Sequence, residues 1–225
     1  MPAGRKVPVR DAEETRRRLL AAAKLEFARS GLAGARVDAI AKRAKINKRM
    51  LYHYFESKEG LFTAVLEEVW ADIRGAERRL MLDQLAPADA IAMLVRFTWQ
   101  YYLGNPEFLT LVNSENLHKA RHVKASDRIR QLSRPFVSMV QAILDRGVAE
   151  GVFRAGIDPV QLNITIAAIG YYYLTNRFTG SIVFERDLMA KTELERRLAF
   201  NLDTILRLVL ADPAVQKPDI NGSAS

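Results

Sequence analysis

The spacing of apolar residues most constrains what this chain can fold into. In segment after segment, apolar side chains recur three, four and seven positions apart, as Leu20, Ala23 and Phe27 do. That spacing places side chains on one face of an α-helix, and no segment shows convincing strand alternation. With 49% hydrophobic residues in 225, the chain has enough apolar material for a sizeable core. The sequence therefore predicts an all-α fold of about nine helices.

Caps and breakers set the expected helix bounds. Gly31 ends the first helix, Asn47 and Ser57 are good N-caps, and Asp158 followed by Pro159 is a strong start signal. Pro135 falls inside a long apolar-periodic stretch and predicts a kink or a restart there. The expected helices cover about 11–30, 37–44, 47–54, 58–82, 87–104, 106–118, 125–150, 159–178 and 191–210.

Positive charge is concentrated in the first quarter of the chain. Residues 1–60 hold 15 Lys and Arg against 7 Asp and Glu, whereas residues 61–225 hold 19 of each. A basic segment joined to a neutral one predicts a polyanionic partner for the first part only. Charge by itself leaves alternatives open: a solvated basic surface, or a helical protein that binds an anionic membrane or an acidic protein.

Several classes of site are excluded or disfavoured by residue usage. The chain has no cysteine, which excludes disulfides, thiolate metal sites and iron–sulfur clusters. No Ser-His-Asp arrangement, Gly-rich phosphate loop or apolar pair of carboxylates is present, so an enzyme is not expected. No apolar run approaches 18 residues, so we expect a cytoplasmic protein without a membrane span and without a cofactor.

One arrangement of histidines has metal-ligand spacing. His118 and His122 are four residues apart, and Glu115 precedes them by three. A lysine, an arginine and a second lysine crowd this segment, and cations repel a metal ion. We therefore predict no metal site.

Two short helices separated by a tight break follow the first helix. Residues 37–44 and 47–54 are the expected pair, which is the layout of a helix–turn–helix. Leu51 and Phe55, spaced i and i+4, can face the core. The rest of the second helix then faces solvent or DNA, where Arg and Lys can donate to guanine, Met can touch a thymine methyl, and Tyr and His can donate to phosphates. Those residues are Lys48, Arg49, Met50, Tyr52 and His53.

A longer motif surrounds this pair. The stretch VDAIAKRAKIN from Val37, followed by LYHYFESKEGL from Leu51, resembles the DNA-binding domain of the tetracycline-repressor (TetR) family, over roughly residues 12–65. The resemblance implies a dimeric transcriptional regulator, most often a repressor. Its N-terminal domain would bind a palindromic operator, and its C-terminal domain would hold a small-molecule pocket and the dimer interface. In this sequence, Lys48, Arg49 and Met50 would read bases, and Tyr52, His53 and Lys58 would contact phosphates.

The sequence departs from the family's usual pattern at two positions. Lys45 stands in the turn where the family usually has Gly, so it must tolerate a positive φ or adopt another turn. Arg36 stands where a hydroxyl residue often caps the second helix, and we expect it to contact phosphate instead. The predicted DNA-binding residues are Arg36, Lys45, Asn47, Lys48, Arg49, Met50, Tyr52, His53 and Lys58.

The neutral part of the chain holds most of the aromatic residues. Such a stripe is more often core than ligand site, but the segments around residues 98–102 and 171–177 mix rings with hydrogen-bonding groups. In residues 113–118, polar side chains continue an apolar run, and they either face a ligand or lie at a helix end in water. The predicted ligand-binding residues are Trp99, Tyr102, Asn113, Asn116, Tyr172 and Asn176.

The expected organisation follows from these segments. Residues 1–10 are predicted to be a flexible basic arm, 11–57 the DNA-binding domain, 58–211 the ligand-binding and dimerisation domain with 58–82 as connecting helix, and 212–225 a disordered tail. The last two helices carry apolar residues that the resemblance assigns to a four-helix bundle between two subunits. The expected partners are operator DNA, a second copy of the chain, and a small molecule with apolar or aromatic surface.

Overall fold

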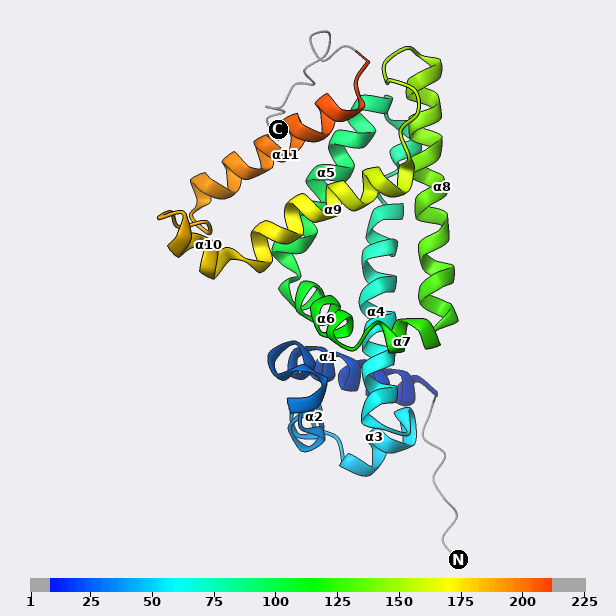
Figure 1. The fold of residues 1–225 in the computed structure, drawn as a ribbon. Helices are drawn as coiled ribbons and strands as arrows, with labels where there is room; N and C mark the ends of the chain where they lie inside the picture. Colours follow the sequence, from blue (N-terminus) through cyan, green and yellow to red (C-terminus); the bar gives the residue numbers. More distant parts are fainter. Residues whose placement is uncertain (1–8, 212–225) are drawn as a thin grey trace, which may run out of the picture. The chain divides into compact units, whose positions relative to one another are not determined.

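The fold is entirely helical over residues 9–211, which are the residues that this computed structural model describes (Figure 1). Within that range the only extended pairing is an isolated bridge between Phe153 and Leu210. The prediction of an all-α fold is thus confirmed. The helices are α1 (Val9–Gly34), α2 (Val37–Ala44), α3 (Lys48–Phe55), α4 (Lys58–Arg78), α5 (Pro87–Gly104), α6 (Pro106–Leu117), α7 (Arg121–Ala125), α8 (Asp127–Ala149), α9 (Pro159–Thr175), α10 (Arg177–Val183) and α11 (Lys191–Val209), with a 3₁₀ turn η1 (Leu82–Gln84).

Most predicted bounds agree with the structure, but the connecting helix expected over 58–82 is α4, which ends at Arg78 before η1. Helices α2 and α5 have the predicted bounds, and α3 starts one residue later because Asn47 is its N-cap. Gly31 has φ 65° and interrupts α1 at the predicted end of the first helix. The predicted arm and tail lie outside the described residues, except that Val9 and Arg10 already belong to α1.

One predicted helix agrees with α8, and another is divided. The helix expected over 125–150 is α8, which begins after Ser126, whose hydroxyl accepts a hydrogen bond from the Ile129 N–H and caps the helix; the short α7 before it was not predicted. Pro135 lies inside α8, which continues through it. The helix expected over 159–178 ends at Thr175, and α10 follows after Asn176, whose N–H donates to the Tyr172 carbonyl.

The chain forms two compact units whose bounds differ from the predicted functional division. The first unit comprises the described residues up to Ala71 together with Thr110–Arg130, and the second comprises Asp72–Leu109 together with the described residues from Gln131. Residues 110–130 join the first unit through long-range contacts: the His122 ring packs edge-on against Phe62 at 5.0 Å, and the Ser126 hydroxyl donates to Glu67 at 2.7 Å.

The core of the first unit is built from the apolar faces of α1 to α4. The rings of Phe27 and Phe62 meet edge to face at 5.0 Å, and both are fully buried. Burial of a side chain of this size stabilises a fold by about 1.5–3 kcal/mol. Leu51 and Phe55 of α3 are buried in the same unit, as their spacing predicted. The opposite side of α3 is therefore left at the surface.

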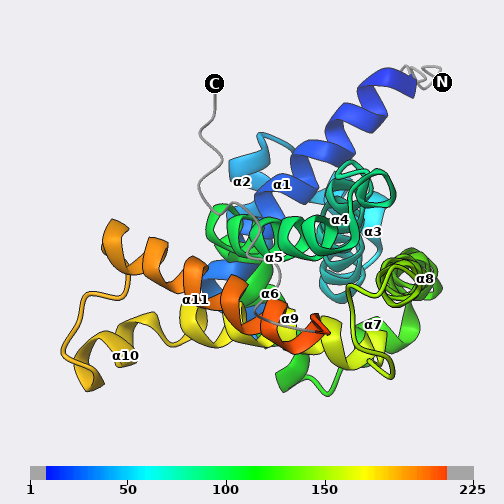
Figure 2. The same ribbon diagram turned by 90° about the horizontal axis from the view of Figure 1, so that it is seen from above.

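The second unit has its own core around α5. Helices α9 and α11 both pack against α5, and α10 joins the ends of α9 and α11 (Figures 1 and 2). Buried residues of α5, α8, α9 and α11 form one apolar cluster that includes Leu94, Ile143 and Ile205. Arg146 of α8 donates to the carbonyls of Leu82 and Leu85 and so holds η1 against α8. Among residues 9–211, no helix combines the length and apolarity that crossing a membrane requires.

Candidate functional site

The turn between α2 and α3 is left-handed at Lys45. Lys45 has φ 55° and ψ 47°, and its N–H donates to the Lys42 carbonyl while the Ile46 N–H donates to the Ala41 carbonyl. These two bonds satisfy carbonyls at the end of α2. The chain therefore keeps a turn that suits glycine, with a lysine in it, and the lysine side chain is exposed.

Because Lys45 combines a strained backbone with a positive charge, Lys45→Gly should have two opposite effects, one on stability and one on DNA binding. Relief of the positive φ should raise the free energy of unfolding by up to about 1 kcal/mol, because the left-handed region costs other L-residues about 1–2 kcal/mol and glycine loses more chain entropy. Loss of the charge should weaken binding to all duplex DNA a few-fold and lower the salt slope by about 1. Chemical denaturation and salt-dependent DNA titrations measure both effects. Lys45→Arg keeps both the charge and the backbone strain, so it should change neither the free energy of unfolding nor DNA binding. If Lys45→Gly is less stable than the parent, the interpretation is contradicted.

The start of α2 is capped from another helix. Arg36 has extended backbone angles, and its side chain makes no cap hydrogen bond. Its N–H instead donates at 3.2 Å to the carboxylate of Glu26, which is buried in α1 and also accepts from Arg29 at 2.8 Å. A carboxylate here also favours the positive end of the α2 dipole. The missing hydroxyl is thereby replaced, and the exposed Arg36 side chain remains available for an anion.

Helix α3 presents a polar and mostly basic surface. The Asn47 side chain accepts from the Arg49 N–H at 2.9 Å, which confirms the predicted N-cap. Met50 is half-buried, and the other side chains that were predicted to face DNA are exposed on α3. These are Lys48, Arg49, Tyr52 and His53.

Two of the predicted DNA-contacting lysines have partners within the protein. The Lys48 ammonium lies 2.9 Å from Asp38 of α2, and the hydrogen bond to Asp38 raises the pKa of Lys48 above its ordinary value. The Lys58 ammonium donates to the Ala33 carbonyl at 3.0 Å. Among the described residues, the Arg49 guanidinium has no such partner. Arg49 is therefore the α3 cation that can donate to a base without first breaking an internal contact.

The six predicted ligand residues are divided between the two compact units. Trp99 and Tyr102 are buried in the second unit, where both rings pack against Gly170. Asn113 and Asn116 are exposed, and the buried polar residue of that segment is Glu115. Tyr172 and Asn176 line a cavity. Trp99 and Tyr102 are thus core residues, which was the alternative to a ligand site for these rings.

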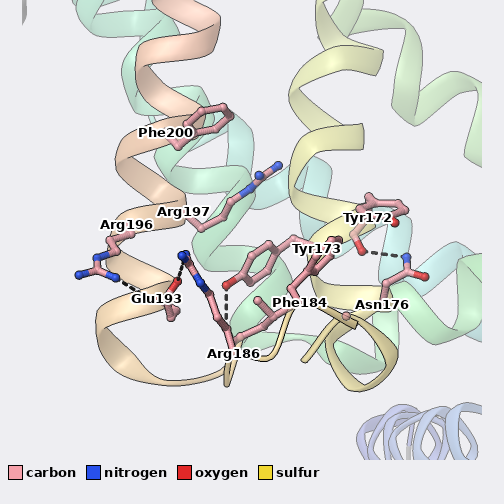
Figure 3. Close-up of a pocket in the computed structure, with 11 residues that line it drawn as sticks. Tyr172, Tyr173, Asn176, Phe184, Arg186, Glu193, Arg196, Arg197 and Phe200 are labelled. Carbon is pink, nitrogen blue, oxygen red and sulfur yellow. Dashed lines mark hydrogen bonds and ion pairs between the residues drawn. The ribbon is translucent and has the colours of Figure 1, made fainter. Parts of the chain in front are cut away.

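That cavity lies between α9, α10 and α11 and measures about 600 Å³ (Figure 3). Sites for small molecules are usually concave, about 300–1,000 Å³, and lined by rings with a few polar groups. Sequence reasoning missed most of this lining, although a run of rings and arginines between residues 184 and 200 was a usable signal. The lining residues are Tyr172, Tyr173, Asn176, Gly180, Phe184, Arg186, Leu188, Glu193, Arg196, Arg197 and Phe200.

A smaller cavity of about 140 Å³ adjoins a buried ion pair of α4. Arg74 donates to Glu77 at 2.7 Å, and its guanidinium covers the Phe136 ring at 4.2 Å. Burial raises the pKa of Glu77 to about 7, against the opposing effect of Arg74 and Arg78. Glu77 therefore changes protonation near neutral pH.

This raised pKa predicts a pH-dependent stability. Between about pH 4.5 and pH 7 the folded protein holds the Glu77 proton more tightly than the unfolded chain, so the contribution of Glu77 to the free energy of unfolding falls as pH rises. The loss is at most about 3 kcal/mol. Glu77→Gln should therefore become more stable relative to the parent between pH 5 and pH 8, as measured by denaturant titration. Glu68→Gln, at an exposed position of α4, is the control; a parallel pH profile for Glu77→Gln and the parent contradicts the prediction.

The histidine segment serves the fold of the first unit. Glu115 accepts from the His122 ring at 2.6 Å and from the N–H groups of His122 and Val123. Its carboxylate thus holds the start of α7. Within residues 9–211, no three His, Cys, Asp or Glu residues gather as metal ligands.

Both parts of the chain match known families. Residues 19–65 match the model of bacterial regulatory proteins of the tetR family, and residues 87–205 match the tetracyclin repressor-like C-terminal domain. The chain is similar to the HTH-type transcriptional repressor NicS of Pseudomonas putida, at 40% identity over 89% of this chain and 95% of NicS. It is also similar to the HTH-type transcriptional repressor SCO4008 of Streptomyces coelicolor, at 32% identity over 71% of this chain and 78% of that protein.

Solved structures agree with these matches. The crystal structure of SCO4942 from Streptomyces coelicolor superposes with a TM-score of 0.65 at 27% identity, over 87% of this chain and 98% of that one. A TetR transcriptional regulator from Chloroflexus aurantiacus gives a TM-score of 0.66 at 21% identity, over 90% of this chain and 99% of that one, which supports the fold. With its helix–turn–helix, its helical second unit and these matches, the chain belongs to the tetR family of bacterial regulatory proteins.

Proposed function

We propose that this chain is a cytoplasmic, ligand-responsive transcriptional repressor that binds a palindromic operator as a dimer. The observation that carries the proposal is the exposed, basic face of α3, held by Leu51 and Phe55 on its opposite side. A helix held in this way can enter the major groove and read bases. The repressor names of NicS and SCO4008 support the sign of regulation.

The functional residues of the DNA-binding region divide into two groups. We assign base reading to Lys48, Arg49 and Met50. We assign phosphate contact to the other predicted DNA-binding residues, which lie within residues 11–57 or at the start of α4. Lys48 and Lys58 would exchange their contacts with Asp38 and Ala33 for contacts with DNA. The phosphate-contacting residues are Arg36, Lys45, Asn47, Tyr52, His53 and Lys58.

The second assignment is that residues 58–211 hold the effector and the dimer interface. A mostly apolar stripe on α9 and α11 supports the interface: its members are at least partly exposed, and their spacing keeps them on one side of each helix. Two such helices from each subunit can form a four-helix bundle. The dimer stripe comprises Val160, Ile164, Ala168 and Tyr172 of α9 and Phe200, Thr204 and Leu208 of α11.

In the proposed mechanism the ligand-free dimer holds two α3 helices at the spacing of successive major grooves. An effector binds better to a dimer whose α3 helices do not have the spacing of successive major grooves. Effector binding therefore favours this dimer, and the operator is released. Such coupling requires differential affinity for the two states, usually about 1–3 kcal/mol. Helix α4 has residues in both compact units and is the proposed connection.

Selection of random and genomic DNA by the purified protein, in about 0.15 M salt, tests the function because non-specific phosphate binding is already weak there. We expect enrichment of a palindrome. Binding without any sequence preference would instead favour the alternative in which the basic region meets an anionic membrane or an acidic protein.

Two substitutions separate base reading from phosphate contact. Arg49→Ala should weaken binding to the selected operator by about 1–3 kcal/mol and leave binding to unrelated DNA nearly unchanged, because it removes a base contact. Lys58→Ala should weaken binding to both DNAs about equally. Fluorescence anisotropy with the two duplexes measures this difference. Equal losses from Arg49→Ala on both duplexes would show that Arg49 acts only through its charge.

A further inference from the structure

The cavity between α9, α10 and α11 carries more positive charge than its own carboxylates neutralise. Its lining holds three arginines, Arg186, Arg196 and Arg197, against one acidic residue, Glu193. Glu193 lies 2.7 Å from Arg196 and 3.9 Å from Arg186, so one carboxylate is shared between two guanidinium groups (Figure 3). A guanidinium prefers a bidentate carboxylate or phosphate partner, and this geometry leaves donors unused.

The third arginine is set deeper in the wall. Arg197 is half-buried, donates to the Ile169 carbonyl at 2.9 Å, and has a buried Nε that no described group accepts. Its guanidinium lies 5.3 Å from the Tyr173 ring centroid and 5.4 Å from that of Phe200. Burial of this cation without a carboxylate partner is unfavourable, and a bound anion would compensate for it.

Aromatic rings form much of the remaining wall. Tyr173 is held by a hydrogen bond from its hydroxyl to the Leu188 carbonyl at 2.9 Å, and its ring packs edge-on against the buried Trp99. Phe184 and Phe200 line the cavity and are largely exposed in the described chain. Together with the fixed ring of Tyr173, these rings offer flat apolar surface next to the arginines, which suits a planar ligand more than a flexible one.

We propose that this cavity binds a small aromatic carboxylate, whose carboxylate is held by Arg186 and Arg197 and whose ring lies against Tyr173 and Phe200. The assignment deepens the proposed function, on which it rests, by placing the effector at the dimer stripe: Tyr172 and Phe200 belong to both the cavity lining and that stripe. A ligand here therefore contacts the surface through which two subunits would meet. Its binding depends on the arrangement of the subunits, which is the property an effector needs.

The test uses 2-naphthoate as the probe and isothermal titration calorimetry of the purified full chain. We expect 2-naphthoate to bind at least ten-fold more tightly than 2-naphthamide, which has the same rings without the charge, and than acetate, which has the charge without the rings. Equal binding of the amide, or no binding of 2-naphthoate, overturns the proposal.

Four variants locate the binding. Arg186→Gln and Arg197→Gln should each weaken 2-naphthoate binding about ten-fold or more, since each removes a charge-assisted hydrogen bond. The Arg186 side chain is exposed, and within residues 9–211 it makes only the long contact to Glu193, so its variant keeps the test valid if Arg197→Gln fails to fold. Glu193→Gln should tighten binding, because it removes the competing carboxylate. Arg207→Gln is the matched control on α11, where Arg207 pairs with Asp203 outside the cavity, and it should change nothing.

The outcomes also separate this inference from the proposed function. If the protein enriches a palindrome but does not bind 2-naphthoate, the proposed function stands and the proposed site is overturned. If 2-naphthoate binds but no DNA sequence is enriched, the site stands and the repressor function fails. If Arg207→Gln weakens 2-naphthoate binding as much as Arg186→Gln does, the effect comes from net charge alone and the proposed site is overturned. With both activities present, saturating 2-naphthoate should weaken operator binding about 5–100-fold in the parent and not in Arg186→Gln.

Discussion

Gly60→Ala is expected to abolish operator binding by destabilising the first compact unit. A Cβ at position 60 would lie 2.3 Å from the Phe55 carbonyl oxygen, far inside van der Waals contact. That oxygen cannot turn away freely, because it accepts from the Ser57 N–H at 2.6 Å and Phe55 itself is buried. The clash therefore falls on the turn that joins α3 to α4.

The expected cost follows from what must move. Either the Phe55 carbonyl gives up its hydrogen bond or the first turn of α4, where Ser57 accepts from the Gly60 N–H at 2.9 Å, opens. Both changes displace the buried side of α3, so we expect a loss of about 3 kcal/mol or more in the free energy of unfolding. Thermal unfolding and operator binding by anisotropy measure it.

A matched control exists in the same unit. Gly34 also lies in a helix, and a Cβ there would meet only the Ser30 Cβ at an ordinary 3.5 Å. Gly34→Ala should keep both the melting temperature and the operator affinity. If Gly60→Ala unfolds within about 1 °C of the parent and binds the operator normally, the rigid α3–α4 turn is not required.

Gly147→Ala is expected to destabilise the second unit by about 3 kcal/mol or more, or roughly 6–12 °C in melting temperature for a chain of this size. A Cβ at position 147 would lie 2.0 Å from the Phe153 ring. The ring is buried, and the segment that carries it is held from both sides: the Phe153 N–H donates to the Gly147 carbonyl, and the Arg154 N–H donates to the Val209 carbonyl. The ring therefore cannot withdraw without breaking the contact between the end of α8 and the end of α11.

A double-mutant cycle identifies the cause. Phe153→Leu removes the ring, so Gly147→Ala should cost much less in that background than in the parent. Gly104→Ala is the control, because nothing lies within 4 Å of its added Cβ and its φ is not positive. Equal costs of Gly147→Ala in both backgrounds, measured by denaturant titration, would show that the ring contact is not the cause.

Local chemistry made much of this fold predictable from the sequence. The bounds of α2 and α5, the N-caps at Asn47 and Asp158 and the break at Gly31 all depend on residues within four positions of one another. The same short range predicts which side of α3 is buried, because Leu51 and Phe55 are one turn apart. The candidate DNA-reading surface is therefore largely readable from about twenty consecutive residues.

Contacts between distant residues decided the rest. The Glu26 carboxylate that replaces the missing cap at Arg36 and the Ala33 carbonyl that holds Lys58 lie on other segments of the chain. Residues 110–130 belong to the first unit because His122 and Ser126 meet α4 side chains about sixty positions away.

The ligand cavity shows the same limit. Its rings and arginines come from three helices, and periodicity within one helix says nothing about which other helix it faces. Trp99 and Tyr102, which were predicted as ligand residues from the mixture of rings and hydrogen-bonding groups in their segment, are buried because α9 and α11 both pack against α5. By itself the sequence determined the helices, their caps and the exposed face of α3, since these depend on neighbours along the chain. Only the tertiary structure decided the caps supplied from afar and the cavity, since helix packing alone brings those residues together.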